Sequence, residues 1–170
     1  MTTKTTKRGP RTKGRHTAAT VMAALAFAGP WTPAAAQDGA AALAAVDRMF
    51  EGMRTADSAM VRSTLADDVR FATLEARGAP PAIRAQSVDG WVSGIAGSGG
   101  AWNEQIYDVQ VLVDGPMASV WAPYTFYLDG AISHCGINSI ELLHDADGWK
   151  VTQISDTRRR EGCPDPLGTG

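Results

Sequence analysis

The 170-residue chain is poor in several informative residue types, and each scarcity excludes a class of protein. It has two cysteines and three histidines, and no group of them has the spacing of zinc ligands. It also has no glycine-rich phosphate loop after a strand-like segment, no serine–histidine–aspartate motif and no internal repeat. We therefore expect no metal site and no cofactor.

Acidic residues are missing from the start of the chain. Residues 1–36 contain six of the 16 Lys and Arg residues and none of the 18 Asp and Glu residues. The rest of the chain holds 10 basic and 18 acidic side chains, so it carries eight net negative charges. Nucleic-acid binding needs a clustered positive surface, which an acidic body disfavours. The composition, 44% hydrophobic and 20% charged, also excludes a disordered charged tail, a collagen-like repeat and a polytopic membrane protein.

A long hydrophobic run is also absent. The apolar stretch that follows the basic segment Lys4–Arg15 covers residues 17–29, which are 13 residues. A run of this length is too short to cross the roughly 30 Å hydrocarbon core of a bilayer as a helix. The order basic, apolar and then small residues at Ala34–Ala36 is typical of a secretory signal peptide. We expect residues 1–36 to be this signal, with an uncleaved anchor or a disordered basic arm as the alternative.

Cleavage near Ala36 would release a secreted or periplasmic protein with no membrane association. Residues 37–170 suffice for a single domain, with a core at about residues 40–163. Both cysteines, Cys135 and Cys163, lie in this part, and an oxidising compartment favours a disulfide between them. The alternative is a reactive thiol at Cys135 beside His134, but no third group that would orient such a pair is evident.

Hydrophobic spacing predicts three helices in the first part of the domain. The apolar residues Leu43, Val46, Phe50 and Met53 recur every three or four positions and share one helix face. Asp57 is a suitable N-cap for a second, short helix over 58–65. A third helix is expected over 87–95, before a glycine-rich segment.

After Trp102 the period of the apolar pattern changes to two, which predicts strands. Three Asp-Gly dipeptides separate runs rich in Val, Ile, Tyr, Trp and Thr, and Asp-Gly supplies the positive φ angles of tight hairpin turns. The expected strands form an antiparallel meander over residues 103–113, 117–128, 131–143 and 149–157. Helices followed by one long curled sheet predict an α+β fold with the three helices on the concave face of a cone-shaped sheet.

Hairpin register predicts which strand residues share a face. A two-residue turn at Asp129–Gly130 places Trp121 opposite Asn138 and Thr125 opposite His134. One face then mixes aromatic and polar side chains: Trp121, Thr125, Tyr127, His134, Asn138, Ile140 and Leu142. The other face is nearly all apolar: Val109, Val111, Val113, Val120, Ala122, Tyr124, Phe126, Cys135, Ile137 and Ser139.

We expect the helices to cover the mixed face, because a ligand pocket has an apolar lining with a few placed polar groups. The apolar face would then lie outside, where a large exposed apolar patch marks a partner surface. A homodimer through the sheet is the expected result. The alternative is the opposite assignment, with His134 and Asn138 exposed.

Several segments resemble the nuclear transport factor 2-like superfamily, and its SnoaL-like and lumazine-binding-protein-like branches most closely. Ala56-Asp57 before a short helix and the stretch Leu65–Phe71 carry the N-terminal half of this resemblance. Residues 124–130, 133–136 and 148–159 are similar to exported bacterial members. The resemblance implies a cone of curved sheet and three helices around a pocket, often in a dimer. The superfamily includes ketosteroid isomerases, polyketide cyclases, dehydratases and binding proteins, so the fold does not decide the function.

Three functions are compatible with these residues. The first is an exported protein that binds a small, partly apolar ligand, with Trp121, Tyr127, Asn138 and Arg158 as ligand-binding residues. The second is an isomerase, cyclase or dehydratase with His134 as general base, Asp156 orienting it and Tyr127 or Asn138 stabilising an oxyanion. The third is a protein-interaction module that works through the apolar sheet face. Asp156 and Arg158 would form an ion pair at a strand end or bind an anionic ligand.

Overall fold

A computed structural model describes residues 1–3, 34–75 and 81–168 of the chain. The chain divides into two units, residues 1–31 and 32–170, and the second contains every helix and strand described below. Almost all of the expected signal peptide, residues 4–33, lies outside the described residues. Among the described residues, no helix is long and apolar enough to cross a membrane.

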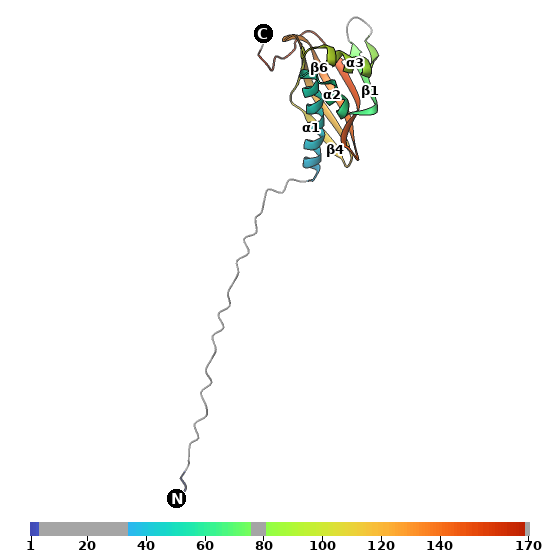
Figure 1. The fold of residues 1–170 in the computed structure, drawn as a ribbon. Helices are drawn as coiled ribbons and strands as arrows, with labels where there is room; N and C mark the ends of the chain where they lie inside the picture. The colour runs from blue at the N-terminus through green and yellow to red at the C-terminus, as the bar shows by residue number, and fades with distance from the viewer. Residues whose placement is uncertain (4–33, 76–80, 169–170) are drawn as a thin grey trace. The chain divides into compact units, whose positions relative to one another are not determined.

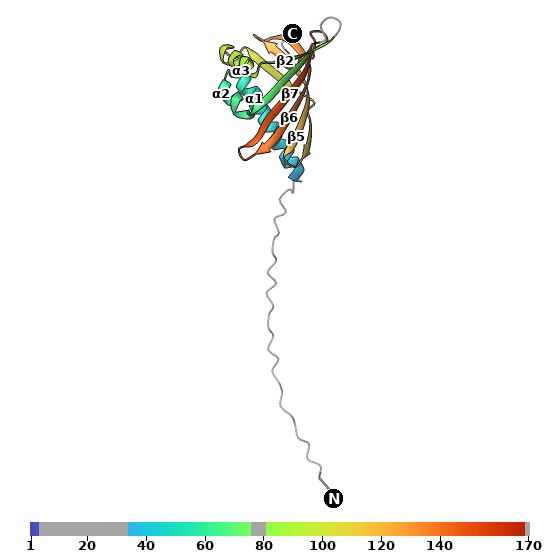
Figure 2. The same cartoon turned by 90° about the vertical axis from the view of Figure 1, so that its right-hand side faces the viewer.

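The three expected helices are present and lie on one face of the sheet (Figures 1 and 2). They are α1 (Ala34–Arg54), α2 (Ser58–Thr64) and α3 (Val88–Gly97). The α1 residues Val46, Met49 and Met53 are at most 1% exposed, as the helical spacing predicts. Asp57 caps α2 by accepting a hydrogen bond from the Met60 amide at 2.8 Å.

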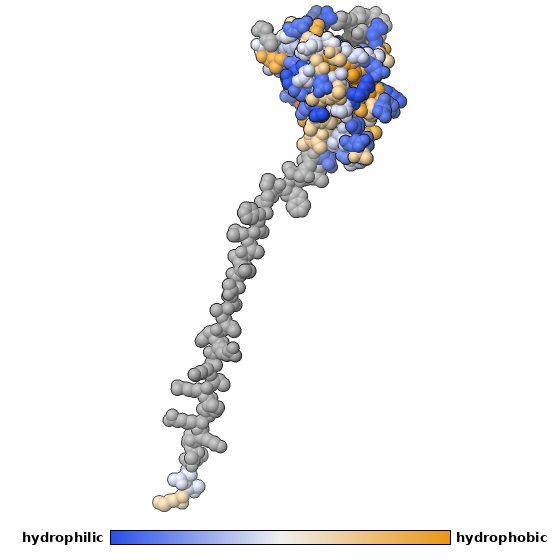
Figure 3. Space-filling view, viewed as in Figure 1, coloured by the Kyte–Doolittle hydropathy of each residue, from blue (hydrophilic) through white to orange (hydrophobic). Residues whose placement is uncertain are grey.

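The side of the domain seen in Figure 3 shows hydrophilic residues around smaller apolar areas.

Within residues 34–75 and 81–168 the sheet has seven strands, more than the four that the sequence predicts. In chain order they are β1 (Leu65–Glu75), β2 (Ala82–Gln86), β3 (Trp102–Ile106), β4 (Gln110–Asp114), β5 (Met117–Leu128), β6 (Ala131–Asp145) and β7 (Gly148–Arg158). Their order in the sheet is β2-β1-β7-β6-β5-β3, with β4 also paired to β5. The pairing of β1 with β7 is parallel and the other pairings are antiparallel.

The expected strand over 103–113 is divided into β3 and β4. Asp108, between them, has a positive φ of 48°, a conformation that Asp tolerates better than most residues. A strand cannot continue through such a residue. The break allows β3 and β4 to pair with different parts of β5.

The predicted register of β5 against β6 is wrong beyond the turn. Leu128 pairs with Ala131 and Tyr127 with Ile132, as expected, but Phe126 then pairs with His134. Ser133 is therefore the extra residue of a β-bulge, and the bulge inverts the relative facing of the two strands.

This inversion exchanges the expected faces of β5 and leaves those of β6 unchanged. His134, Asn138, Ile140 and Leu142 lie on the concave face beneath the helices, as predicted. Trp121 pairs with Ser139 on the outer face and is 51% exposed, whereas its predicted place was the pocket. Thr125 and Tyr127 were also expected on the pocket face and lie on the outer face. The residues that were expected outside and pack in the core instead are Val109, Val111, Val113, Val120, Ala122, Tyr124 and Phe126.

The last described residues, 159–168, lie over the outer face, and we call them the C-terminal strap. The expected disulfide Cys135–Cys163 joins the strap to β6, with 5.5 Å between the Cα atoms. Tyr127, which was expected in the pocket, is only 1% exposed and donates a hydrogen bond from its hydroxyl to Asp165 Oδ1 at 2.6 Å. Thr125 Oγ1 donates to the carbonyl of Pro164 at 2.9 Å. The strap therefore covers the outer face of β5 and β6 near the turn that joins them.

Candidate functional site

Two spaces that share part of their lining lie between the concave face of the sheet and the helices. The larger, which we call the vestibule, has a volume of about 490 Å³ and is bordered by Trp91 of α3, Trp102 of β3 and Leu128 of β5. The smaller, the inner chamber, measures about 80 Å³. Gln86, Trp91, Glu104 and Arg158 border both spaces. A molecule in the vestibule can therefore reach the same polar groups that line the inner chamber.

Aromatic rings form much of the vestibule wall. Trp102 and Phe126 meet edge to face with their centroids 6.1 Å apart, and His134 stacks on Phe126 at 4.9 Å. On the helix side, Trp91 meets Phe71 edge to face at 5.0 Å. These ring contacts give the vestibule a largely aromatic wall on both the sheet side and the helix side.

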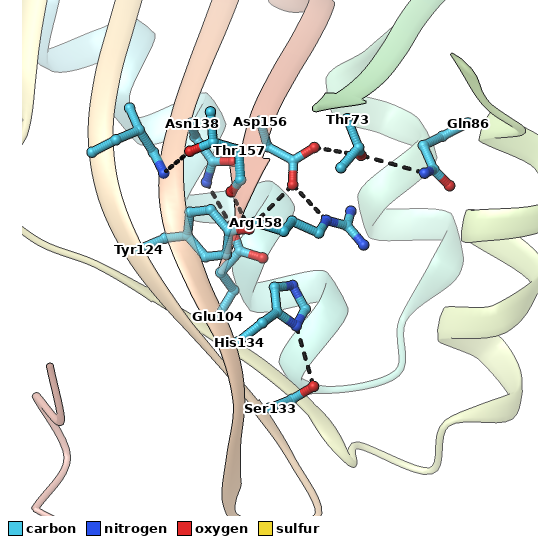
Figure 4. A network of polar contacts seen from close by, with 11 residues as sticks. Thr73, Gln86, Glu104, Tyr124, Ser133, His134, Asn138, Asp156, Thr157 and Arg158 are labelled. Carbon is cyan, nitrogen blue, oxygen red and sulfur yellow. Dashed lines mark hydrogen bonds and ion pairs between the residues drawn. The ribbon is translucent and has the colours of Figure 1, made fainter. Parts of the chain in front are cut away.

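Four polar residues of the inner chamber form what we call the polar floor: Glu104, Asn138, Asp156 and Arg158 (Figure 4). Two of them, Glu104 and Arg158, also border the vestibule. Asp156 is the best satisfied of the four, and its side chain is 9% exposed. It accepts hydrogen bonds from Thr73 Oγ1 at 2.5 Å and from Arg158 Nε at 2.6 Å. Its pairing with Arg158, which the sequence predicts, is therefore a charge-assisted contact inside the site.

Tyr124 supports the polar floor from β5. Its hydroxyl lies 3.1 Å from Asp156 Oδ2 and 3.0 Å from the carbonyl oxygen of Thr157. Burial is the main cause that raises the pKa of Tyr124, and the nearby carboxylates Glu104 and Asp156 raise it further. The phenol therefore stays protonated and acts as a hydrogen-bond donor.

Gly136 makes room for this contact. It lies opposite Tyr124 on β6, and a Cβ atom there would be 3.0 Å from the Tyr124 ring and 1.8 Å from the Thr157 oxygen. The second distance is impossible for a side chain, so only glycine fits. The Gly of the His134-Cys135-Gly136 segment thus has a structural role in the site.

Glu104 is the residue of the site that the sequence analysis missed. Asn138 Nδ2 donates a hydrogen bond to Glu104 Oε1 at 2.6 Å. Burial raises the pKa of Glu104 to about 7, and the charge of Asp156 adds to this effect, while the Asn138 bond and Arg158 oppose it. At neutral pH the carboxyl group is therefore divided between its acid and its ionised form, as a proton-transfer group requires.

A sequence signal for Glu104 exists, although it is weak. Trp102, Glu104 and Ile106 alternate along a strand, so a carboxylate stands between two apolar residues on the same face. A charged residue at an inward position is an exception that indicates a functional or buried group.

The structure brings four of the predicted site residues to the concave side and leaves two outside. His134, Asn138 and Arg158 border the vestibule or the inner chamber, together with Asp156. Asp156 bonds with Thr73, Tyr124 and Arg158, and His134 Nδ1 lies 3.2 Å from Ser133 Oγ. Trp121 and Tyr127 lie on the outer face because of the bulge at Ser133.

No group of three or more His, Cys, Asp or Glu residues that could hold a metal ion occurs within the part of the chain that the structure describes.

Comparison with known proteins identifies similar structures and no similar sequences. No family model and no curated protein matches the chain. A nuclear transport factor 2-like protein of unknown function from Shewanella baltica has a TM-score of 0.58 and 12% identity, covering 76% of this chain and 100% of its own. A candidate dehydratase of the same fold family from Streptomyces avermitilis has a TM-score of 0.54 and 17% identity, covering 74% and 98%. A candidate ketosteroid isomerase from Shewanella frigidimarina has a TM-score of 0.51 and 18% identity, covering 68% and 94%.

Proposed function

From the nuclear transport factor 2-like fold of this chain, we propose that the protein binds a small, partly apolar molecule in the vestibule. The observation that carries the proposal is an aromatic-walled space of about 490 Å³ that ends on the polar floor. Sites for small molecules are typically roughly 300–1,000 Å³, mostly apolar, with a few polar groups that fix the orientation of the ligand. The vestibule supplies the apolar surface, and Glu104 and Arg158 supply the orienting groups.

Blocking the vestibule tests this function. Leu128 borders the vestibule and is 43% exposed, so Leu128→Trp narrows the space without entering the core. Leu112→Trp is the matched control, because Leu112 is 73% exposed and borders neither the vestibule nor the inner chamber. We expect native mass spectrometry of protein purified from its own host to detect a bound molecule in the wild type and in Leu112→Trp, and not in Leu128→Trp. Equal retention by all three proteins would contradict binding in the vestibule.

A second candidate function is proton transfer to and from the bound molecule. It is favoured by the position of Glu104, whose pKa near 7 suits a general acid or base, beside the donors Asn138 and Arg158. Two of the similar structures carry names that indicate a dehydratase and a ketosteroid isomerase. In an isomerisation, Glu104 would take a proton from one carbon and return it to another, so no co-reactant is consumed. Under this proposal Glu104 replaces His134 as the first choice for the base.

Deuterium exchange distinguishes Glu104 from His134 as the general base. The molecule that co-purifies with the protein is incubated in D₂O with each variant, and deuterium incorporation is followed by mass spectrometry. Glu104→Gln should slow the exchange by about two to four orders of magnitude if Glu104 moves the proton. If His134→Gln abolishes the exchange and Glu104→Gln does not, His134 is the base.

We also propose that the protein is exported and forms a homodimer through the outer face of the sheet. The basic and apolar order of residues 1–36 and the disulfide Cys135–Cys163 support export. The dimer is supported by a groove of about 310 Å³ on the outer face, bordered by Leu74, Trp121 and Ile137. The mass of the protein recovered outside the cytoplasm tests both the cleavage near Ala36 and the disulfide.

A further inference from the structure

The polar floor contains two carboxylates and one guanidinium group, and the guanidinium is committed to one of the carboxylates. Arg158 Nε donates to Asp156 Oδ2 at 2.6 Å, and the Asp156 side chain also accepts bonds from Thr73 and Tyr124. The charge of Asp156 is therefore matched by Arg158. Because Arg158 borders both the vestibule and the inner chamber, its guanidinium also faces the space where a ligand would lie.

Glu104 has a neutral partner, the amide of Asn138, at 2.6 Å. The charges that act on its carboxyl group come from β7, where Asp156 and Arg158 have opposite effects. The titratable groups of the neighbouring strands are Tyr124 of β5, which stays protonated, and His134 of β6 in the vestibule wall. The polar floor is thus neutral when Glu104 is protonated and carries one net negative charge when Glu104 is ionised.

Helix α1 adds no compensating positive charge beside Glu104. Its charged residues in the groove that Glu104 also borders are Asp47, Glu51 and Arg54. Glu51 and Arg54 form an ion pair at 2.6 Å, and burial raises the pKa of Asp47. The nearest helix therefore does not favour the ionised form of Glu104.

Resting on the ligand-binding function proposed above, we propose that the ligand is uncharged, that it offers a hydrogen-bond acceptor such as a carbonyl oxygen, and that Glu104 takes up a proton when it binds. A ligand that fills the vestibule removes the water that solvates an ionised Glu104, so binding favours the acid form. The protonated Glu104 and the Arg158 guanidinium are then two donors directed at one acceptor. An anionic ligand would meet the carboxylate of Asp156 and would gain only Arg158, which Asp156 already engages. A cationic ligand would meet Arg158, and it would gain Glu104 as a counter-charge only by keeping that carboxyl group ionised where burial disfavours the ionised form.

Three matched naphthalene probes test the charge class of the ligand. They are 2-acetylnaphthalene, which is neutral, 2-naphthoate, which is anionic, and 2-naphthylmethylamine, which is cationic. Titration calorimetry of the wild type should show that the ketone binds at least tenfold more tightly than either charged probe at about pH 7. The ketone affinity should fall by about tenfold per pH unit above about pH 7, and buffers of different ionisation enthalpy should show proton uptake.

The variant Glu104→Gln tests whether Glu104 causes the pH dependence of ketone binding. The amide keeps a neutral donor and an acceptor for Asn138, so this variant should bind the ketone as the wild type does at about pH 6 and lose the decline at higher pH. Glu161→Gln is the matched control, because Glu161 is exposed in the strap and borders neither the vestibule nor the inner chamber, and it should titrate as the wild type does.

Tighter binding of either charged probe, ketone binding that is independent of pH in the wild type, or no binding of any probe would overturn the proposal. Native mass spectrometry of Leu128→Trp against Leu112→Trp reports on vestibule binding itself. Suppose that the bound molecule is lost only from Leu128→Trp, but that a charged probe binds more tightly than the ketone. This result would reject the proposed ligand class and retain the proposed binding function.

Discussion

At the residue scale, Glu104 couples the stability of the fold to pH. Its pKa is about 7 in the folded protein against 4.5 for an ordinary glutamate, so the folded state holds a proton that the unfolded state has lost between these values. The contribution of Glu104 to the free energy of unfolding is therefore largest below about pH 4.5 and decreases as the pH rises toward about 7.

Replacing Glu104 by Gln should therefore flatten the pH dependence of stability. We expect Glu104→Gln to gain roughly 1–3 kcal/mol over the wild type at about pH 8 and little at about pH 5, because the amide needs no proton to remain neutral. Urea denaturation of both proteins at the two pH values measures the difference. Equal slopes of stability against pH in the two proteins would show that Glu104 is solvated in the folded state.

Gly136 is the second residue whose identity the site fixes. A Cβ atom 1.8 Å from the Thr157 oxygen forces β6 and β7 apart and displaces Tyr124 from Asp156. We expect Gly136→Ala to lose at least roughly 1–3 kcal/mol of unfolding free energy, as overpacked sites do. Gly97→Ala is the control, since a Cβ atom there meets nothing within 4 Å and should leave stability unchanged or slightly higher. Thermal denaturation that ranks the two variants the other way would contradict the proposed contact.

Single residues were predicted from the sequence where local chemistry decides their role. The Asp57 cap and the Asp156–Arg158 pair are of this kind. The Cys135–Cys163 disulfide was predicted for a different reason, because the chain has two cysteines and both lie in the same domain. Glu104 was not predicted, because its role comes from neighbours such as Asn138 that lie 34 positions away in the sequence. Burial that depends on tertiary contacts leaves little trace in the local pattern.

At the element scale, one inserted residue in β6 decides which side chains of β5 face the vestibule. The turn at Asp129–Gly130 predicts the first two pairs of the hairpin correctly, and the bulge at Ser133 then inverts all later pairs. Helices α1 to α3 were predicted well because a helical period requires no partner. The strands β1 and β2 were not among the predicted strands, because strands are defined by their pairing and β1 pairs in parallel with the distant β7.

Deleting Ser133 tests the role of the bulge. Without this residue, the regular register turns Tyr124 and Phe126 outward or His134 and Asn138 outward, and either arrangement exposes core residues. We expect the deletion to abolish cooperative unfolding, whereas Ser133→Ala should change stability by less than about 1 kcal/mol, because it keeps the residue count. Circular dichroism of both variants during heating measures this. If the deletion variant unfolds like the wild type, the register of β5 and β6 can shift without loss of stability, and the proposed role of the bulge is wrong.

At the scale of the whole molecule, the outer face of the sheet is divided between the strap and an apolar groove. The strap covers Tyr127, Thr125 and Cys135 near the β5–β6 turn. The groove, with Trp121 and Leu74 on its border, lies on the part of the face that the strap leaves open. The proposed dimer would therefore use this patch and not the Val120, Ala122 and Phe126 surface that the sequence predicts, because those side chains lie in the core.

A charge placed in the groove should separate the two copies. Trp121 is 51% exposed at the border of the groove, so Trp121→Glu adds a carboxylate to the patch, and two-fold symmetry would bury that charge twice in a dimer. We expect light scattering to give the dimer mass for the wild type and the monomer mass for Trp121→Glu, with unchanged circular dichroism. Leu143→Glu is the control, since Leu143 is 49% exposed near the β6–β7 turn, away from the groove, and should stay dimeric. A wild type that already has the monomer mass would reject the dimer and leave the groove for a different partner.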